Sequence, residues 1–156
     1  MSNQKFFYVS YIKTTPEELW RALTSSEFTR QYWMGNRVES DWKIGSTVKF
    51  TSPDGKLVLS GKVLAAERPK LLSYTWSLQL SEEVKSEKPS RVVFQLERYE
   101  PNPQLVKLTV MHDEFPENSK VFPGINEGWP MVLSGLKTLL ETKEGTSFEG
   151  TCGQPH

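Results

Sequence analysis

The stretch that decides the fold lies near the C-terminus and reads Gly128-Trp129-Pro130-Met131-Val132-Leu133-Ser134-Gly135-Leu136-Lys137-Thr138-Leu139-Leu140-Glu141. Its apolar residues recur at the spacing of one helical face: Trp129, Val132, Leu133, Leu136 and Leu140. We predict one long helix here, with Pro130 in its first turn and Gly145 as its stop. Because this apolar stripe is wide, a large partner surface must cover it.

The segments upstream supply that surface, because most of them alternate as strands do. We predict strands over residues 5–12, 37–41, 46–51, 56–67, 71–80, 91–99 and 104–114. Two short helices follow the first strand: Thr15 and Glu18 form a capping box around Pro16, and Ser25 or Ser26 caps the second. The prediction is an α+β helix-grip fold, in which a curved antiparallel sheet of six to seven strands wraps around the last helix.

Length and composition exclude several classes of protein. The 156 residues suit one domain, predicted over residues 1–144, with a polar, flexible tail over 145–156. The 19 basic and 19 acidic residues give a net charge of zero, whereas nucleic-acid binders are usually basic. The one cysteine, Cys152, cannot form an intramolecular disulfide. No apolar run reaches the ~20 residues of a membrane span and no signal peptide begins the chain, so we expect a cytoplasmic protein.

Several motifs resemble one known family when they are taken in order. They are Thr14-Thr15-Pro16-Glu17-Glu18-Leu19-Trp20-Arg21-Ala22-Leu23-Thr24, Tyr32-Trp33, Gly61-Lys62-Val63, Pro69-Lys70-Leu71-Leu72-Ser73-Tyr74-Thr75-Trp76, Leu108-Thr109-Val110-Met111-His112 and Gly128-Trp129. Together they make residues 7–140 similar to a bacterial member of the activator-of-heat-shock-protein-90-ATPase homologue family. This family belongs to the START-like superfamily, also named SRPBCC or Bet v 1-like.

The resemblance implies a sheet that grips the last helix, with a cavity between them. Members of the superfamily bind lipids, sterols, polyketides or other apolar molecules, and some are cyclases. The eukaryotic namesake stimulates a chaperone ATPase. Because one fold serves several functions, the resemblance alone does not decide among them.

The inward strand and helix registers supply the residues that would line such a cavity. The candidates are Trp33, Phe50, Leu59, Tyr74, Trp76, Phe94, Val110, His112, Trp129, Val132 and Leu133. Tyr74 and His112 would hold the polar end of a ligand, and the aromatic rings of Trp33, Trp76, Phe94 and Trp129 would contact its apolar body. The alternative interpretation is that all of these side chains fill a solid core, with His112 hydrogen-bonded to Tyr74 or to the backbone.

We therefore expect a non-enzymatic carrier or sensor of a small apolar or amphipathic molecule, without metal or other cofactor, as a monomer or homodimer. One alternative is an interaction module for a chaperone or another protein, through the charged loop 82–88 or the outer sheet face. A second is a cyclase- or hydrolase-like enzyme in which His112 and an inward Glu114 move protons. No set of His, Cys and carboxylate residues has the spacing of a zinc site.

Overall fold

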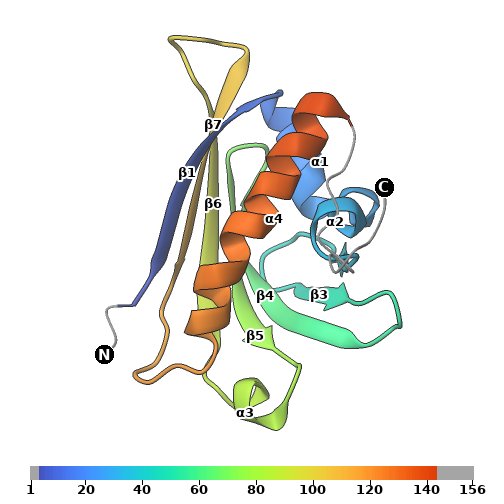
Figure 1. The fold of residues 1–156 in the computed structure, drawn as a ribbon, viewed down its shortest axis with the longest axis vertical. Helices are drawn as coiled ribbons and strands as arrows, with labels where there is room; N and C mark the ends of the chain where they lie inside the picture. Colours follow the sequence, from blue (N-terminus) through green and yellow to red (C-terminus); the bar gives the residue numbers. More distant parts are fainter. Residues whose placement is uncertain (1–3, 144–156) are drawn as a thin grey trace.

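The computed structural model describes residues 4–143 and places a seven-stranded antiparallel sheet around one long helix (Figure 1). The strands are β1 (Phe6–Lys13), β2 (Arg37–Glu39), β3 (Thr47–Thr51), β4 (Leu57–Glu67), β5 (Leu71–Leu78), β6 (Ser90–Arg98) and β7 (Leu105–Asp113). Their order is β1-β7-β6-β5-β4-β3-β2, so β1 and β2 are the edges. This arrangement confirms the predicted α+β helix-grip fold.

Within the described residues, four helices accompany the sheet: α1 (Pro16–Thr24), α2 (Ser26–Tyr32), α3 (Glu82–Lys85) and α4 (Phe122–Thr142). The predicted cap of α1 is confirmed, because Thr15 Oγ1 accepts a hydrogen bond of 3.1 Å from the Glu18 N–H. The single-turn helix α3 lies where the sequence predicted only a charged loop. Its formation follows from Ser81, whose side chain accepts a bond from the Val84 N–H.

The long helix α4 begins earlier than predicted, and the predicted place of Pro130 is wrong. Helix α4 starts at Phe122, so Pro130 lies in its interior. Buried Val121, Ile125 and Trp129 follow one another at intervals of four and extend the apolar stripe toward the N-terminus. The free energy gained by burying these side chains offsets the loss of the backbone hydrogen bond that a proline inside a helix cannot form.

The C-terminal end of α4 is set by a residue in the left-handed region. Lys143 has φ 64°, and its N–H donates to the Leu139 carbonyl at 2.8 Å. The predicted stop at Gly145 and the predicted tail 145–156 lie outside the described residues. None of the described helices is both long and apolar enough to cross a membrane.

Strand β4 departs from simple alternation. Its pairing with β3 shifts register between Phe50 and Thr51, and Leu57 is 39% exposed although Leu59 and Val63 on the same strand are buried. Further along the strand, a Cβ atom at Gly61 would lie only 1.8 Å from the Thr75 carbonyl oxygen. Only glycine permits this close approach of β5 at position 61.

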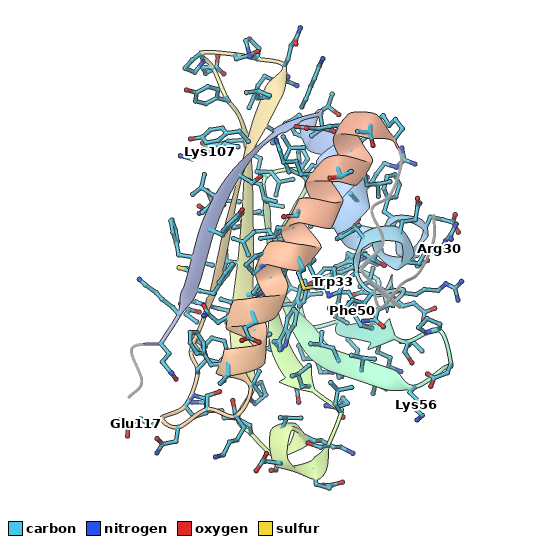
Figure 2. The ribbon with its side chains drawn as sticks, in the orientation of Figure 1. Arg30, Trp33, Phe50, Lys56, Lys107 and Glu117 are labelled. Atoms are coloured by element: carbon cyan, nitrogen blue, oxygen red, sulfur yellow. The ribbon has the colours of Figure 1, made fainter. Side chains whose placement is uncertain are left out.

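Helix α4 is fixed to strand β1 by two polar contacts near its C-terminal end. Lys137 Nζ donates to the Tyr11 carbonyl at 2.5 Å, and Glu141 Oε2 accepts from the Lys13 N–H at 2.9 Å. Side chains from the helix and the inner sheet face fill most of the space between them (Figure 2). Near Leu136 the core is closed, because this side chain has no exposed surface. Any cavity must therefore lie toward the N-terminal half of α4.

Candidate ligand pocket

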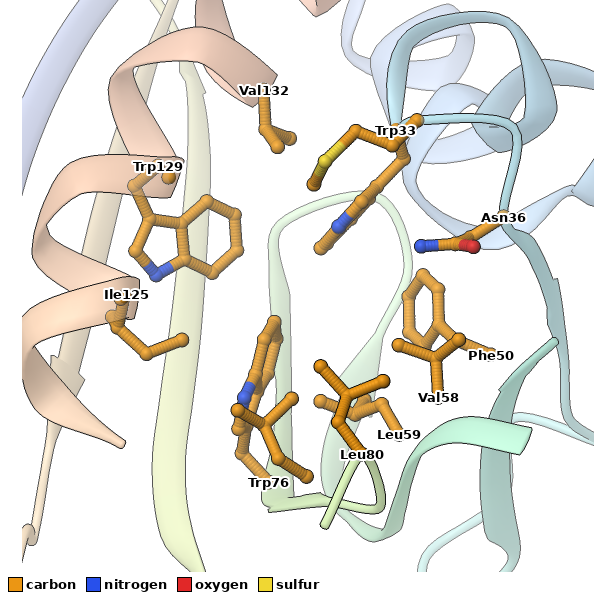
Figure 3. Close-up of a pocket in the computed structure, with 14 residues that line it drawn as sticks. Trp33, Asn36, Phe50, Val58, Leu59, Trp76, Leu80, Ile125, Trp129 and Val132 are labelled. Atoms are coloured by element: carbon orange, nitrogen blue, oxygen red, sulfur yellow. The ribbon is translucent and has the colours of Figure 1, made fainter. Parts of the chain in front are cut away.

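A cavity of about 230 Å³ lies between the N-terminal half of α4, the end of α2 and strands β3 to β5 (Figure 3). Its walls are almost entirely apolar and carry no charged side chain. They consist of Trp33, Met34, Asn36, Phe50, Val58, Leu59, Trp76, Leu78, Leu80, Gly124, Ile125, Gly128, Trp129 and Val132.

The structure divides the sequence-predicted cavity residues into two groups. One group lines the cavity: Trp33, Phe50, Leu59, Trp76, Trp129 and Val132. The other group is buried in the core outside the lining: Tyr74, Phe94, Val110, His112 and Leu133. The two groups differ in where they lie along the inner face of the sheet. Strand alternation predicts which face a residue is on, but it does not predict where along that face the side chains pack without a gap.

Three indole rings define the aromatic wall. The ring centroids of Trp33 and Trp129 are 5.3 Å apart, those of Trp76 and Trp129 5.4 Å, and those of Trp33 and Trp76 6.1 Å. Phe50 packs on Trp33 at 4.6 Å. The three indoles come from the residue that follows α2, from β5 and from α4, so the fold itself assembles this wall from segments that are distant in sequence.

Sequence reasoning missed the residues at the mouth and on the helix side of the pocket. These are Met34, Asn36, Val58, Leu78, Leu80, Gly124, Ile125 and Gly128. The spacing of Gly124 and Gly128 could have indicated these residues, because two glycines at positions i and i+4 lie on the same face of a helix. The signal was lost because the helix was predicted to start at Gly128. Leu80 and Met34 are 68% and 43% exposed, which makes the rim apolar as well.

The mouth is braced by a carboxylate that joins two loops. Glu87, after α3, accepts hydrogen bonds from Ser119 Oγ at 2.5 Å and from the Lys120 N–H at 2.7 Å. Ser119 Oγ in turn accepts from the Phe122 N–H at 3.0 Å, at the start of α4. Glu87 thus fixes the segment after Leu80 to the first turn of the helix that forms the opposite wall.

His112 lies outside the lining, hydrogen-bonded on both ring nitrogens. Its Nδ1 is 3.1 Å from Trp129 Nε1, and its Nε2 is 2.7 Å from Ser90 Oγ. Because an indole N–H can only donate, Nδ1 must accept and the imidazole proton resides on Nε2. The predicted partner was wrong: the Tyr74 hydroxyl is buried and has no hydrogen-bond partner in the described part of the chain.

The electrostatic surroundings keep His112 neutral. Burial lowers the pKa of His112 from 6.5 to about 3, and the nearby Asp113 carboxylate opposes that shift only in part. Its side chain has no exposed surface. His112 therefore acts as a fixed acceptor for the Trp129 indole, in contact with neither solvent nor the cavity.

Glu114 does not point inward as strand alternation predicted. Strand β7 ends at Asp113, and Glu114 has φ 65° and is exposed, with Oε2 3.5 Å from Arg91 Nη1. Arg91 also forms a two-point pair with Asp113, at 2.9 and 2.6 Å. The proposed proton-transfer pair of His112 and Glu114 is not assembled. Among residues 4–143, no group of three or more His, Cys, Asp or Glu residues could hold a metal ion.

Comparisons with known proteins agree with this fold. The family model described as "Activator of Hsp90 ATPase homolog 1-like protein" matches residues 13–141. Protein MLL2253 from Mesorhizobium loti is 27% identical, with a TM-score of 0.74 over 90% of this chain and 99% of the other. The Aha1 dimer from Colwellia psychrerythraea is 23% identical, with a TM-score of 0.71 over 91% and 99%. A search of curated proteins found no match.

A third neighbour extends the fold comparison to a more distant sequence. CalU16 from Micromonospora echinospora is 18% identical, with a TM-score of 0.67 over 89% of this chain and 77% of the other. At this identity the likeness concerns the fold alone. The shared architecture is therefore the sheet and gripped helix that enclose the pocket.

Proposed function

The chain belongs to the Activator of Hsp90 ATPase homolog 1-like protein family, and from this premise we propose that it binds a small apolar molecule reversibly in the pocket, as a carrier or sensor. The enclosing fold and the apolar, uncharged lining support the proposal. Release of the ligand unchanged distinguishes this function from catalysis. The hydrogen bonds on both nitrogens of His112 favour binding over an enzyme built on that residue.

The observation that carries the proposal is the apolar volume itself. An enclosed, empty apolar cavity destabilises a protein by about 24 cal/mol per Å³. For 230 Å³ this corresponds to at most about 5.5 kcal/mol, because the pocket opens at a mouth. A domain is stable by only about 5–15 kcal/mol. A solid core would have been more stable, and an occupant would recover the lost contacts.

Two glycines on the lining face of α4 support the same conclusion. A Cβ atom at Gly124 or at Gly128 would meet nothing within 4 Å, so neither glycine is required by close packing. Glycine within a helix is about 1 kcal/mol less favourable than alanine. The helix therefore carries two unfavourable residues where larger side chains would enter the pocket.

The test is to fill the pocket from α4. We expect wild-type protein to bind naphthalene saturably with one molecule per chain in calorimetry, and Gly128→Leu to weaken that affinity at least tenfold. The control is Ser134→Leu, on an exposed position of the same helix, which should bind as wild type does. Absence of saturable binding by wild type across naphthalene, indole and naphthoquinone would contradict the proposal, as would unchanged affinity in Gly128→Leu.

A second candidate function is contact with a partner protein, which the edge strand β1 favours. Phe7 is 58% exposed and Tyr11 40% exposed on this edge strand, whose first half lies away from the two backbone bonds that Tyr11 and Lys13 make to α4. The partner class suggested by the family is a chaperone ATPase. Phe7→Lys should weaken binding to the purified heat-shock protein 90 of the same organism at least tenfold, whereas Leu64→Lys on β4 should not. No binding by wild type contradicts this candidate.

A further inference from the structure

The indole N–H of Trp76 is a buried donor that has no partner among residues 4–143, although the ring lines the pocket. Two other indoles near it, Trp129 on the lining and Trp42 behind it, are hydrogen-bonded. Trp129 donates to His112, and Trp42 donates to the Thr24 carbonyl at 3.0 Å. Buried polar groups are nearly always hydrogen-bonded, so an unpartnered one at a pocket wall points to a missing partner. Figure 3 shows the Trp76 nitrogen on the ring edge that faces Ile125 and Trp129.

The lining offers further polar groups on the opposite side of the pocket. Asn36 is buried, with 8% of its surface exposed, and Figure 3 shows its amide beside Trp33 and Phe50. The Trp33 nitrogen lies on the ring edge turned toward Trp129 and Trp76 in the same view. Indole groups can only donate, so the partner that this wall selects must be an acceptor.

Charge and size restrict the ligand further. The lining has no Lys, Arg or His to compensate an anion and no carboxylate to compensate a cation, so an ionised ligand would lose its hydration without a counter-charge. An apolar cavity of about 150 Å³ holds benzene. A volume of about 230 Å³ therefore suits a molecule of one or two rings.

We propose that the ligand is a neutral one- or two-ring molecule whose carbonyl oxygen accepts a hydrogen bond from Trp76 Nε1. This inference rests on the proposed binding function and specifies its ligand class. The flat indole and phenyl walls contact the ring system, while the carbonyl oxygen pairs with Trp76 Nε1, a lining donor that has no partner within residues 4–143.

The experiment compares two probes of the same shape, 2-acetylnaphthalene and 2-isopropenylnaphthalene, which differ in C=O against C=CH₂. Dissociation constants are measured for wild type and for Trp76→Phe, which keeps an aromatic ring and removes the N–H. We expect wild type to prefer the ketone about fivefold or more, as one added hydrogen bond predicts. The preference should disappear in Trp76→Phe, and the ionised probe 2-naphthoate should bind wild type at least tenfold more weakly than the ketone.

The outcomes separate this inference from the function on which it rests. Equal affinity of wild type for the ketone and the alkene would contradict a ligand with a hydrogen-bond acceptor, but it would agree with an apolar binding pocket. A ketone preference that persists in Trp76→Phe overturns the assignment to Trp76. Tighter binding of 2-naphthoate than of the ketone would contradict the proposal that the ligand is neutral. If none of the three probes binds, both this inference and the proposed binding function are contradicted. If Trp76→Phe fails to fold, the wild-type Trp76 indole proton resonance replaces it: it should move downfield with the ketone and not with the alkene.

Discussion

Trp129 Nε1 donates a hydrogen bond to His112 Nδ1 across 3.1 Å, and this contact joins the pocket wall on α4 to strand β7. On its far side, His112 Nε2 donates to Ser90 Oγ on β6. The imidazole thus holds the indole of the wall in place without lining the pocket itself. His112 is a positioning residue for Trp129, and its chemistry is that of a neutral acceptor.

The first prediction concerns pH. Neutral His112 keeps its folded-state pKa near 3, whereas the unfolded chain binds a proton near pH 6.5. The unfolded state therefore holds more protons between these values, and stability falls as the pH falls through that window. The loss should be on the order of 1 kcal/mol per pH unit. Urea unfolding from pH 7 to 4 measures it in wild type and in His112→Gln, which can still accept and donate but does not titrate. Identical pH profiles would contradict the buried neutral imidazole.

The second prediction separates binding from stability along α4. Trp129→Ala should weaken naphthalene binding at least tenfold, because the ring forms one wall of the pocket. Leu136→Ala should cost about 2–5 kcal/mol of stability, because Leu136 is fully buried outside the lining. Its affinity for naphthalene, measured below its unfolding midpoint, should stay within about twofold of wild type. The reverse pattern would place the pocket at the wrong end of the helix.

The third prediction is a gain of stability at the expense of binding. Gly128→Ala should raise the free energy of unfolding by up to about 1 kcal/mol, because alanine favours the helix and its Cβ meets no atom within 4 Å. The added methyl group reduces the pocket, so naphthalene affinity should fall. Thermal unfolding and calorimetry on the same samples measure both quantities. The exposed change Ser134→Ala serves as control, and a destabilised Gly128→Ala would show that the glycine has a structural role.

The fourth prediction concerns the mouth. Glu87→Gln weakens the charge-assisted bonds to Ser119 and to the Lys120 N–H, which brace the two sides of the opening. Ligand release should accelerate severalfold, and the affinity should change less than the release rate. Stopped-flow displacement of bound 2-acetylnaphthalene measures the rate. Glu83→Gln, on an exposed residue of α3, is the matched control. Equal release rates in wild type and Glu87→Gln would contradict the brace.

The fold was predictable from sequence because its signals are local and agree with one another. The Thr15 cap, the strand alternation and the apolar stripe from Trp129 to Leu140 each specify an element directly. The start of α4 could not be predicted from Pro130. A proline usually marks the first turn of a helix, but here the burial of Ile125 and its neighbours keeps the helix intact on both sides of Pro130.

For the pocket, the sequence predicted only which face of the sheet its residues lie on. Alternation placed Tyr74 and Trp76 on one face of β5, and both are buried, yet only Trp76 lines the pocket. The difference depends on how far α4 extends and on which neighbour fills each gap, and both are tertiary properties. The hydrogen bond between His112 and Trp129 has the same character, since nothing in the local sequence indicates which donor reaches the imidazole.

The most direct test of a ligand pocket is a titration of protein labelled with ¹⁵N at tryptophan, followed through its five indole signals as naphthalene is added. The signals are assigned by single Trp→Phe variants. The account predicts saturable shifts at Trp33, Trp76 and Trp129, which line the cavity, and none at Trp20 and Trp42, which do not. Shifts that fail to saturate, or saturable shifts confined to Trp20 and Trp42, would contradict the pocket placed between α4 and the sheet.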